Sequence, residues 1–243
     1  MEDQKIPIIT VKNLYKIYRV GETKVYALNG VDFNIYKGEF CAIVGPSGSG
    51  KSTLLNMLAG LEKPTKGEII ISGNHIEKLT ENQLVAFRRD HVGFIFQSYN
   101  LLKTMNALEN AAMPLAFRGV PKKERNAVAK KYLKLVGLEK QMNHMANAMS
   151  GGQQQRVGIA RALAMNPKII FADEPTGNLD SKTTKEVLEL MRKIVREENQ
   201  TLIMVTHDNY IAGFADRQFH IVDGKIMKIE EKSQTEENEH EKV

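Results

Sequence analysis

The fold of this chain is decided by one stretch of its sequence, Phe40-Cys41-Ala42-Ile43-Val44-Gly45-Pro46-Ser47-Gly48-Ser49-Gly50-Lys51-Ser52-Thr53-Leu54-Leu55. Residues 45–52 match the pattern G-x-x-x-x-G-K-[S/T] in full, between an apolar run typical of a strand and a run typical of a helix. The glycines allow a tight turn whose N–H groups converge on one point, and the positive end of the next helix lies there too. The alternative, a glycine-rich turn that fits by chance, does not explain the flanking strand and helix. The sequence therefore predicts a phosphate-binding loop made by Gly45, Pro46, Ser47, Gly48, Ser49, Gly50, Lys51, Ser52 and Thr53.

Two side chains of this loop have distinct predicted roles. Lys51 would reach the β- and γ-phosphate oxygens of ATP as a mobile point charge. The hydroxyl of Ser52 would bind Mg²⁺, which prefers hard oxygen ligands and keeps several waters. We therefore expect a site for ATP together with Mg²⁺.

Composition is ordinary for one globular domain: 243 residues, 42% hydrophobic and 26% charged. The single cysteine, Cys41, cannot form a disulfide within the chain, and we expect it to pack in the core. No apolar run approaches the roughly 20 residues of a membrane helix, and the first residues have no secretory pattern. We expect a cytoplasmic protein.

The net charge of +5 is unevenly distributed. Residues 230–243 contain six glutamates and two lysines, or −4, which leaves +9 for residues 1–229. We expect the acidic tail to be disordered because it has almost no apolar residues. The basic residues of the body are scattered without interleaved aromatics, which favours a solvated face, then a face near a membrane, over nucleic-acid binding.

Strands and helices alternate along most of the chain, which predicts an α/β fold. Short β-type runs precede the phosphate loop, residues 108–136 have a helical pattern, and after residue 152 helices alternate with near-continuous apolar strands. Such apolar strands are typical of a parallel sheet buried on both faces. The strands expected around the site are 40–44, 92–96, 169–172 and 202–205.

Three of these strands are followed by polar residues, at the edge of the sheet where ligands bind. Asp173 and Glu174 follow 169–172; Asp173 would hold Mg²⁺, and Glu174 would polarise the attacking water. An acidic helix cap is the alternative for this pair. Gln97, after 92–96, would reach Mg²⁺ or the water, and His207, after 202–205, would contact the γ-phosphate.

A second glycine-containing segment, Ser150-Gly151-Gly152-Gln153, opens a predicted helix. Ser150 is a good N-cap, and the glycines would leave backbone N–H groups open to an anion. The alternative is a glycine-rich start of a helix with no ligand. The order of all these motifs along the chain argues for a ligand.

This set of motifs resembles the ATP-binding subunits of ABC transporters over residues 8–229. The resemblance places Lys51 and Ser52 in Walker A, Gln97 in the Q-loop, residues 149–153 in the signature, and Asp173 and Glu174 in Walker B. It also places Asp180 in the D-loop and His207 in the switch loop. It implies a P-loop NTPase core with a parallel sheet, an N-terminal antiparallel β subdomain and an inserted α-helical subdomain at about residues 98–157, within a single domain of residues 1–229.

In that family the signature of one subunit binds the γ-phosphate of ATP held by a second copy, so two chains sandwich two nucleotides. The resemblance therefore implies nucleotide contacts from Ser150, Gly151, Gly152, Gln153 and Asp180. An aromatic residue upstream usually stacks on the adenine, and we assign this role to Tyr18 rather than Tyr15. Two departures, Met149 for the usual leucine and Gly158 within the following helix, touch no predicted phosphate contact.

The segment 173–180, with 93–97 and 100–102, is similar to the lipoprotein-release, macrolide-efflux and antimicrobial-peptide-export group. Lys103 stands where many members have proline, in a region that contacts the membrane partner. The resemblance implies an ATPase that dimerises on ATP and drives a separate permease, of an exporter or envelope-lipid/peptide type, from the inner face of the membrane. The alternative is a regulatory ATPase that transmits force to an envelope or cell-division complex without transport. Ribosome or DNA-repair ABC proteins and phosphate-loop kinases fit the single domain and the full motif set less well.

Overall fold

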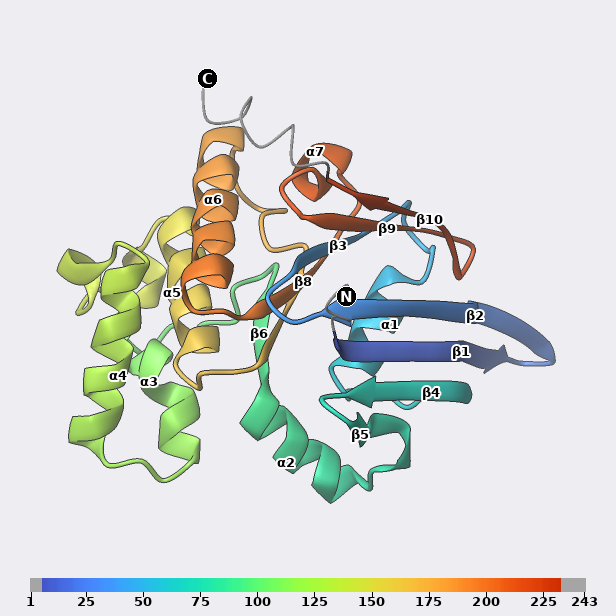
Figure 1. Cartoon of the computed structure of the whole chain (residues 1–243). Coiled ribbons are helices and arrows are strands. Elements are labelled where there is room, and N and C mark those ends of the chain that lie inside the picture. The colour runs from blue at the N-terminus through green and yellow to red at the C-terminus, as the bar shows by residue number, and fades with distance from the viewer. Residues whose placement is uncertain (1–5, 233–243) are drawn as a thin grey trace, which may run out of the picture. The chain divides into compact units, whose positions relative to one another are not determined.

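The computed structural model describes residues 6–232, which form two compact units (Figure 1). The first contains residues 6–79 and 201–232, and the second contains residues 80–200. Glu230 and Glu231, which we assigned to the acidic tail, belong to the last strand, and the rest of that tail from residue 233 lies outside the described residues.

The first unit contains an antiparallel sheet with the strand order β2-β1-β4-β5. Strand β1 (Pro7–Val20) pairs with β2 (Thr23–Tyr36) and with β4 (Lys66–Ile71), and β5 (Asn74–His75) pairs with β4. Strand β1 continues through Asn13, which has a positive φ of 48°, and its register with β2 shifts between Val11 and Leu14. A 3-10 turn, η1 (Ile76–Lys78), follows β5.

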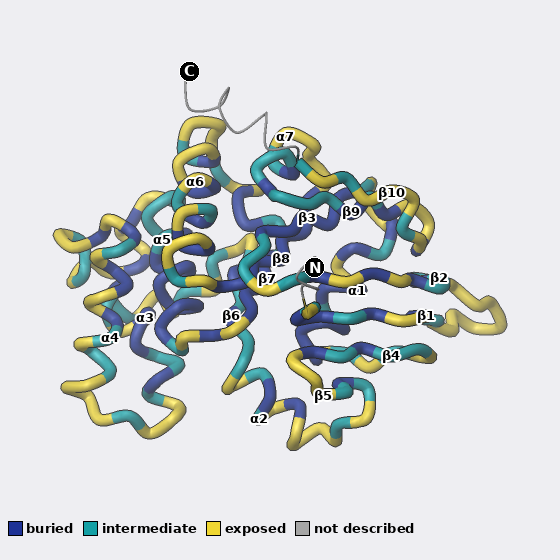
Figure 2. Tube along the Cα trace, in the orientation of Figure 1, coloured by how far each residue is buried: buried dark blue, intermediate teal, exposed yellow. Residues whose placement is uncertain are grey.

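The same unit contains the strands around the phosphate loop. Strand β3 (Phe40–Val44) lies between β8 (Thr201–Thr206) and β9 (Arg217–Val222), parallel to both, and β10 (Lys225–Glu231) pairs antiparallel with β9. All residues of β3 and β8 are buried (Figure 2), as their continuous apolar sequences predict. Helix α1 (Lys51–Leu58) follows β3, and α7 (Asn209–Ala212) follows β8.

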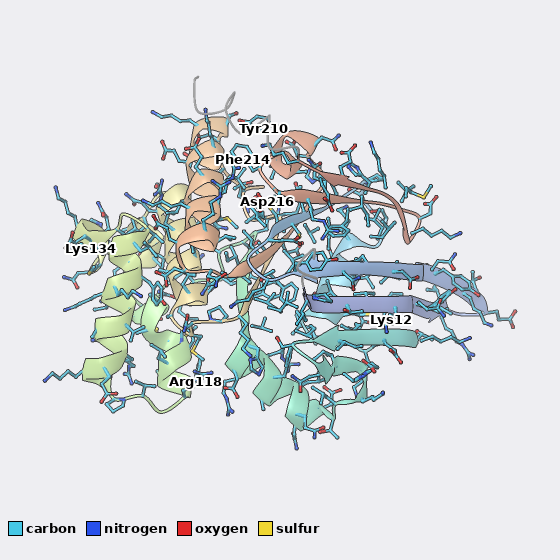
Figure 3. All side chains as sticks on the ribbon, in the orientation of Figure 1. Lys12, Arg118, Lys134, Tyr210, Phe214 and Asp216 are labelled. Atoms are coloured by element: carbon cyan, nitrogen blue, oxygen red, sulfur yellow. The ribbon has the colours of Figure 1, made fainter. Side chains whose placement is uncertain are left out.

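The turn after α7 is held by an aromatic pair. The rings of Tyr210 and Phe214 meet edge to face, with centroids 5.5 Å apart (Figure 3). This is a favourable geometry for two π-systems. The aromatic pair precedes Asp216 in the chain. The Asp216 carboxylate accepts a hydrogen bond of 2.9 Å from the backbone N of Phe40, which connects this turn to the beginning of β3.

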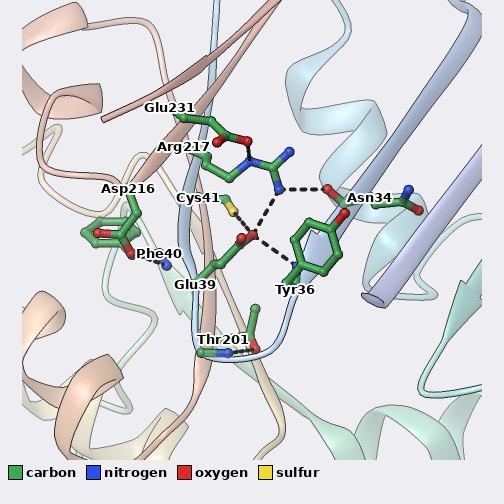
Figure 4. Close-up of polar contacts among 10 residues, drawn as sticks. Asn34, Tyr36, Glu39, Phe40, Cys41, Thr201, Asp216, Arg217 and Glu231 are labelled. Carbon is green, nitrogen blue, oxygen red and sulfur yellow. Dashed lines mark hydrogen bonds and ion pairs between the residues drawn. The ribbon is translucent and has the colours of Figure 1, made fainter. Parts of the chain in front are cut away.

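A network of charged side chains surrounds the beginning of β3 (Figure 4). Glu39 Oε2 accepts hydrogen bonds from Tyr36 N at 3.0 Å and from Arg217 Nη1 at 3.1 Å. Arg217 also donates to the carbonyl of Asn34 and pairs through Nε with Glu231 at 3.1 Å. The network therefore connects β2, β3, β9 and β10. Burial, above all, raises the pKa of the Cys41 thiol next to it, which keeps Cys41 a neutral core residue as expected.

The second unit contains two parallel strands and most of the helices. Strand β6 (Val92–Phe96) pairs with β7 (Ile169–Asp173). The helices are α2 (Glu81–His91), α3 (Ala107–Phe117), α4 (Lys122–Leu135), α5 (Gly151–Leu163) and α6 (Ser181–Glu197), with 3-10 turns η2 (Glu139–Gln141) and η3 (Ala146–Ala148).

Local signals explain where these helices begin and end. Thr80, Asn106 and Ser150 each form a capping box with the third residue of their helix. The helical pattern expected over 108–136 is divided into α3 and α4 around Gly119, which has φ 76°, and α4 is followed by Gly137 with φ 77°. Among the described residues, no helix has the length and apolarity needed to cross a membrane.

Candidate functional site

The predicted site residues fall in both units. The phosphate loop, Tyr18 and His207 belong to the first unit. The second unit contains the residues that resemble the Q-loop, signature, Walker B and D-loop: Gln97, Ser150, Gly151, Gly152, Gln153, Asp173, Glu174 and Asp180.

The backbone of the phosphate loop needs glycine for two reasons. Gly50 is the N-cap of α1 with φ 101°, and a Cβ there would overlap the carbonyl of Ala27. A Cβ on Gly45 would overlap the carbonyl of Ile221 in the same way. The loop is thus packed against neighbouring backbone on one side, while Pro46, Ser47 and Gly48 are exposed. This leaves a cradle of backbone at the N-terminus of α1, the kind of place where anions bind.

Two polar side chains of the loop are buried. Lys51 is 7% exposed and its Nζ donates to the carbonyl of Pro46 at 2.8 Å, so the ammonium group lies over the loop. Ser49 is 3% exposed, and its Oγ has no hydrogen-bond partner among the described residues. An unpaired buried hydroxyl is costly in the absence of a ligand. Its presence in this loop fits a bound phosphate oxygen as the missing partner.

The hairpin of β9 and β10 is hydrogen-bonded to the phosphate loop. Gly224, in the turn between β9 and β10, donates from its N to the carbonyl of Ser49 at 3.0 Å, and its own carbonyl accepts from Asn29 N at 2.8 Å. This hairpin is not among the elements predicted from the sequence. The signal was present, because Asp223-Gly224 between two apolar alternating runs is a strong hairpin pattern.

His207 leaves the sheet next to the phosphate loop. Val44, the last residue of β3, is the parallel partner of Thr206, the last residue of β8. The Thr206 hydroxyl accepts from Asp208 N at 3.1 Å, and Asp208 caps α7. His207 therefore leaves the same sheet edge as the phosphate loop, as expected, and the two strands are neighbours within this unit. His207 itself is exposed.

Tyr18, our choice for stacking on adenine, is held in a fixed orientation. Its hydroxyl donates to the carboxylate of Glu62 at 2.8 Å, and the Lys16 ammonium lies 5.2 Å from the ring centroid and 2.8 Å from Glu62. Burial, followed by this hydrogen bond, raises the pKa of Tyr18 above its usual value. Tyr18 is 36% exposed, which leaves surface for a ligand.

In the second unit, the ends of β6 and β7 bring three predicted residues together. Phe96 is the parallel partner of Asp173, so Gln97 and Glu174 follow directly at the same edge. Glu174 has a positive φ of 44°, which costs of order 1–3 kcal/mol in a residue other than glycine. Strain of this kind clusters at functional sites, and it agrees with a catalytic role for Glu174.

The signature segment begins α5 as predicted. The Ser150 side chain accepts from Gln153 N at 3.3 Å, while Gln153 Oε1 accepts from Ser150 N at 3.1 Å, so Gln153 closes a capping box. Neighbouring side chains pack closely on both glycines: a Cβ on Gly151 would lie 2.8 Å from the Tyr99 hydroxyl, and one on Gly152 would lie 2.5 Å from the Thr183 methyl group, so a side chain at either position would displace its neighbour. The first amides of the helix have no partner within it and can bind an anion.

Asp180 is placed at the N-terminus of α6, next to this turn. One carboxylate oxygen accepts from Thr183 N at 3.0 Å and the other from Thr183 Oγ1 at 2.7 Å. The hydrogen bond from the Thr183 hydroxyl, followed by that from its amide, holds the pKa of Asp180 below its usual value. Asp180 is therefore an ionised helix cap in this structure.

The donor set fits a nucleoside triphosphate with Mg²⁺. The loop offers convergent amides, a buried ammonium and an unpaired hydroxyl, which suit phosphate oxygens. In the first unit Ser52 offers a hydroxyl oxygen, and in the second unit Gln97 and Asp173 offer amide and carboxylate oxygens. Oxygen atoms of these kinds are the ligands that Mg²⁺ prefers.

Comparison with known proteins agrees with this chemistry. Residues 28–177 match the family model described as ABC transporter. An ABC transporter ATP-binding protein of Thermotoga maritima is 49% identical over 223 residues, which are 92% of this chain and 95% of that protein. The macrolide export ATP-binding/permease protein MacB of Chlorobium phaeobacteroides is 46% identical over 94% of this chain, which spans 34% of that protein.

A solved structure matches the whole architecture. It is the dimeric, post-hydrolysis ATP-binding cassette MJ0796, of Methanocaldococcus jannaschii, bound to ADP and Pi. The TM-score is 0.83 at 45% identity, covering 92% of this chain and 98% of that one. The expected fold class, a P-loop core with an antiparallel β subdomain and inserted helices, is confirmed.

Proposed function

This chain belongs to the ABC transporter family and is an ATPase of that family. We propose that two copies close around two ATP molecules to drive a separate membrane permease of exporter type. The observation that carries the proposal is the phosphate loop itself, with a buried Lys51 and an unpaired buried Ser49 hydroxyl. The dimeric state of the relative bound to ADP and Pi supports the sandwich. The similarity to MacB supports export.

In the proposed site, the phosphate loop of one copy and the signature turn of the other hold one nucleotide. Lys51 and the amides of residues 48–52 bind the β- and γ-phosphates, and the first amides of α5, with Ser150, bind the γ-phosphate from the opposite side. The Ser150 hydroxyl still has its proton to donate, because it serves only as an acceptor in the capping box.

Hydrolysis is assigned to residues of the two strand-end groups. Glu174 accepts a proton from the attacking water, while Gln97 and His207 orient the water and the γ-phosphate. Mg²⁺, when bound, neutralises charge on the phosphates, and Ser52, Gln97 and Asp173 are the residues that would hold it. Tyr18 provides the surface for the adenine ring, and Asp180 approaches the site from the D-loop.

The proposed permease contact is an apolar groove of the second unit. Its volume is about 410 Å³. It is lined by Arg161 and by side chains of β6 and α3, including Phe94, Phe96, Met113 and Pro114. It lies directly beside Asn100, which follows Gln97 closely along the chain. A permease segment placed there from the membrane would act next to a residue of the ATPase site. We accordingly propose a location at the cytoplasmic face of the membrane.

The experiment that tests the sandwich is Glu174→Gln with Mg-ATP. The variant should bind ATP without cleaving it and should accumulate as a dimer, measured by light scattering, while the wild type returns to monomer as ATP is consumed. A Glu174→Gln variant that stays monomeric at saturating Mg-ATP contradicts the sandwich. A force-transmitting regulator would form the same dimer, so this experiment does not separate the two functions. The membrane partner that purifies with the chain separates them: reconstituted in vesicles, a permease transports substrate, whereas the partner of a regulator does not.

A further inference from the structure

The segment that follows β6 has an unusual backbone. Tyr99 and Asn100 have positive φ values of 57° and 49°, in two consecutive residues that are not glycine. Each such residue costs of order 1 kcal/mol or more, and the conformation persists only where the surroundings determine it. The segment directly follows Gln97, so whatever holds it also fixes Gln97.

Arg161 of α5 holds this segment from inside the unit. Its guanidinium donates to the carbonyl of Asn100 at 2.5 Å and to the carbonyl of Tyr99 at 2.8 Å. Arg161 is only 7% exposed, and burial lowers the pKa of its guanidinium. A buried cation carries a large desolvation cost. The hydrogen bonds to these two carbonyls offset part of that cost, so they must be well formed.

Asn178 holds the same segment from the other side. Its Nδ2 donates to the carbonyl of Gln97 at 3.0 Å. The preceding residue, Gly177, lies against the side chain of Gln97, since a Cβ there would be 2.8 Å from Gln97 Nε2. Both residues belong to the loop that leaves Glu174, so the amide of Gln97 rests on the segment next to the proposed catalytic acid.

Tyr99 connects this arrangement to the signature turn. Its hydroxyl lies 3.5 Å from the carbonyl of Asn178 and so close to Gly151 that a side chain there would displace it. Burial raises the pKa of Tyr99, so its hydroxyl stays neutral. A displacement of residues 97–100 would therefore disturb the start of α5 as well.

We propose that Asn178 and Arg161 are positioning residues for the ATPase reaction: together they lock residues 97–100 so that Gln97 stands at its working position beside the Glu174 loop. The inference rests on the role proposed for Gln97. Neither side chain touches the nucleotide in this assignment. Their effect on catalysis passes through the backbone of residues 97–100.

Asn178→Ala tests the first contact in the full chain. Because Asn178 is exposed, the variant should fold normally while Gln97 loses its anchor. We expect kcat to fall about tenfold, the KM for ATP to change less than about twofold, and half-maximal activity to need several-fold more Mg²⁺. Asn82→Ala, an exposed asparagine in the first turn of α2, is the control and should match the wild type.

Arg161 is tested by two variants, because removal of a buried cation can unfold the chain. Arg161→Lys retains a positive charge and one donor nitrogen, so it should recover most of the kcat that Arg161→Met loses. Amide hydrogen exchange at residues 97–102 should be faster in Arg161→Met than in the wild type. Unchanged kcat and Mg²⁺ dependence in Asn178→Ala overturn the proposal, as does equal kcat in folded Arg161→Lys and Arg161→Met. Gln97→Ala separates the two hypotheses: if Gln97→Ala itself has full activity, the role assigned to Gln97 is wrong.

Discussion

The two ends of strand β3 have opposite polar chemistry, although only five residues separate them. At its beginning, Glu39 and Arg217 are mostly buried and bonded to each other and to the backbone. At its end, the Ser49 hydroxyl is buried without a partner among the described residues, and Lys51 lies over a backbone carbonyl. Charged side chains that pair with each other stabilise a fold, whereas a buried hydroxyl without a partner in a phosphate-binding loop fits a bound anion.

The largest expected effect concerns the end of β3. Lys51→Met removes the charge that we propose binds the phosphates, and we expect kcat for ATP hydrolysis to fall about 100-fold to 1,000-fold. The midpoint of thermal unfolding without nucleotide should change much less, because methionine keeps most of the apolar stem of the lysine side chain in place. Phosphate release and thermal melts measure the two quantities. Lys12→Met, an exposed lysine of β1, serves as the control, and a Lys51→Met protein with wild-type kcat would contradict the assignment.

The beginning of β3 should behave in the opposite way. Arg217→Met leaves the Glu39 carboxylate without its cation, and we expect the free energy of unfolding to fall by about 2–3 kcal/mol. The side chains are 12% and 16% exposed, so solvent screens part of the charge and the effect stays at the low end for buried pairs. The KM for ATP should remain unchanged. Denaturant unfolding measures the loss.

A double-mutant cycle makes this test specific. Adding Glu39→Gln to Arg217→Met should recover part of the lost stability, because the second change removes the unpaired charge. Additive losses would show that the two residues act independently, and a raised KM for ATP would show that the network also serves the nucleotide.

The site was more predictable from sequence than the elements that support it. The phosphate loop and the Ser150 cap are local patterns, so their motifs specify both the residues and the structure. Helix α2 and the hairpin of β9 and β10 were not predicted, although a capping box at Thr80 and the Asp223-Gly224 turn signal them. These signals span only two to four residues, and neither contains a residue with a predicted role in binding or catalysis.

The contacts between distant segments could not be predicted at all. Gly224 donates to the carbonyl of Ser49, and Asn178 donates to the carbonyl of Gln97. Each contact depends on tertiary packing that brings remote parts of one unit together. The same holds for the left-handed conformation of Glu174, which the surrounding structure imposes against the local preference of a glutamate.

The smallest effect separates the two ends of β3 most directly. Ser49→Ala removes a buried hydroxyl that lacks a partner, so the free energy of unfolding without nucleotide should stay the same or rise by up to about 1 kcal/mol, while the KM for ATP rises about fivefold. Thr201→Val is the matched control, because the buried Thr201 hydroxyl accepts from Gly38 N at 3.1 Å near the beginning of β3. Thr201→Val should lose about 1 kcal/mol of stability and keep its KM. If both variants lose stability and keep their KM, the Ser49 hydroxyl has a structural role and its missing partner is not a phosphate.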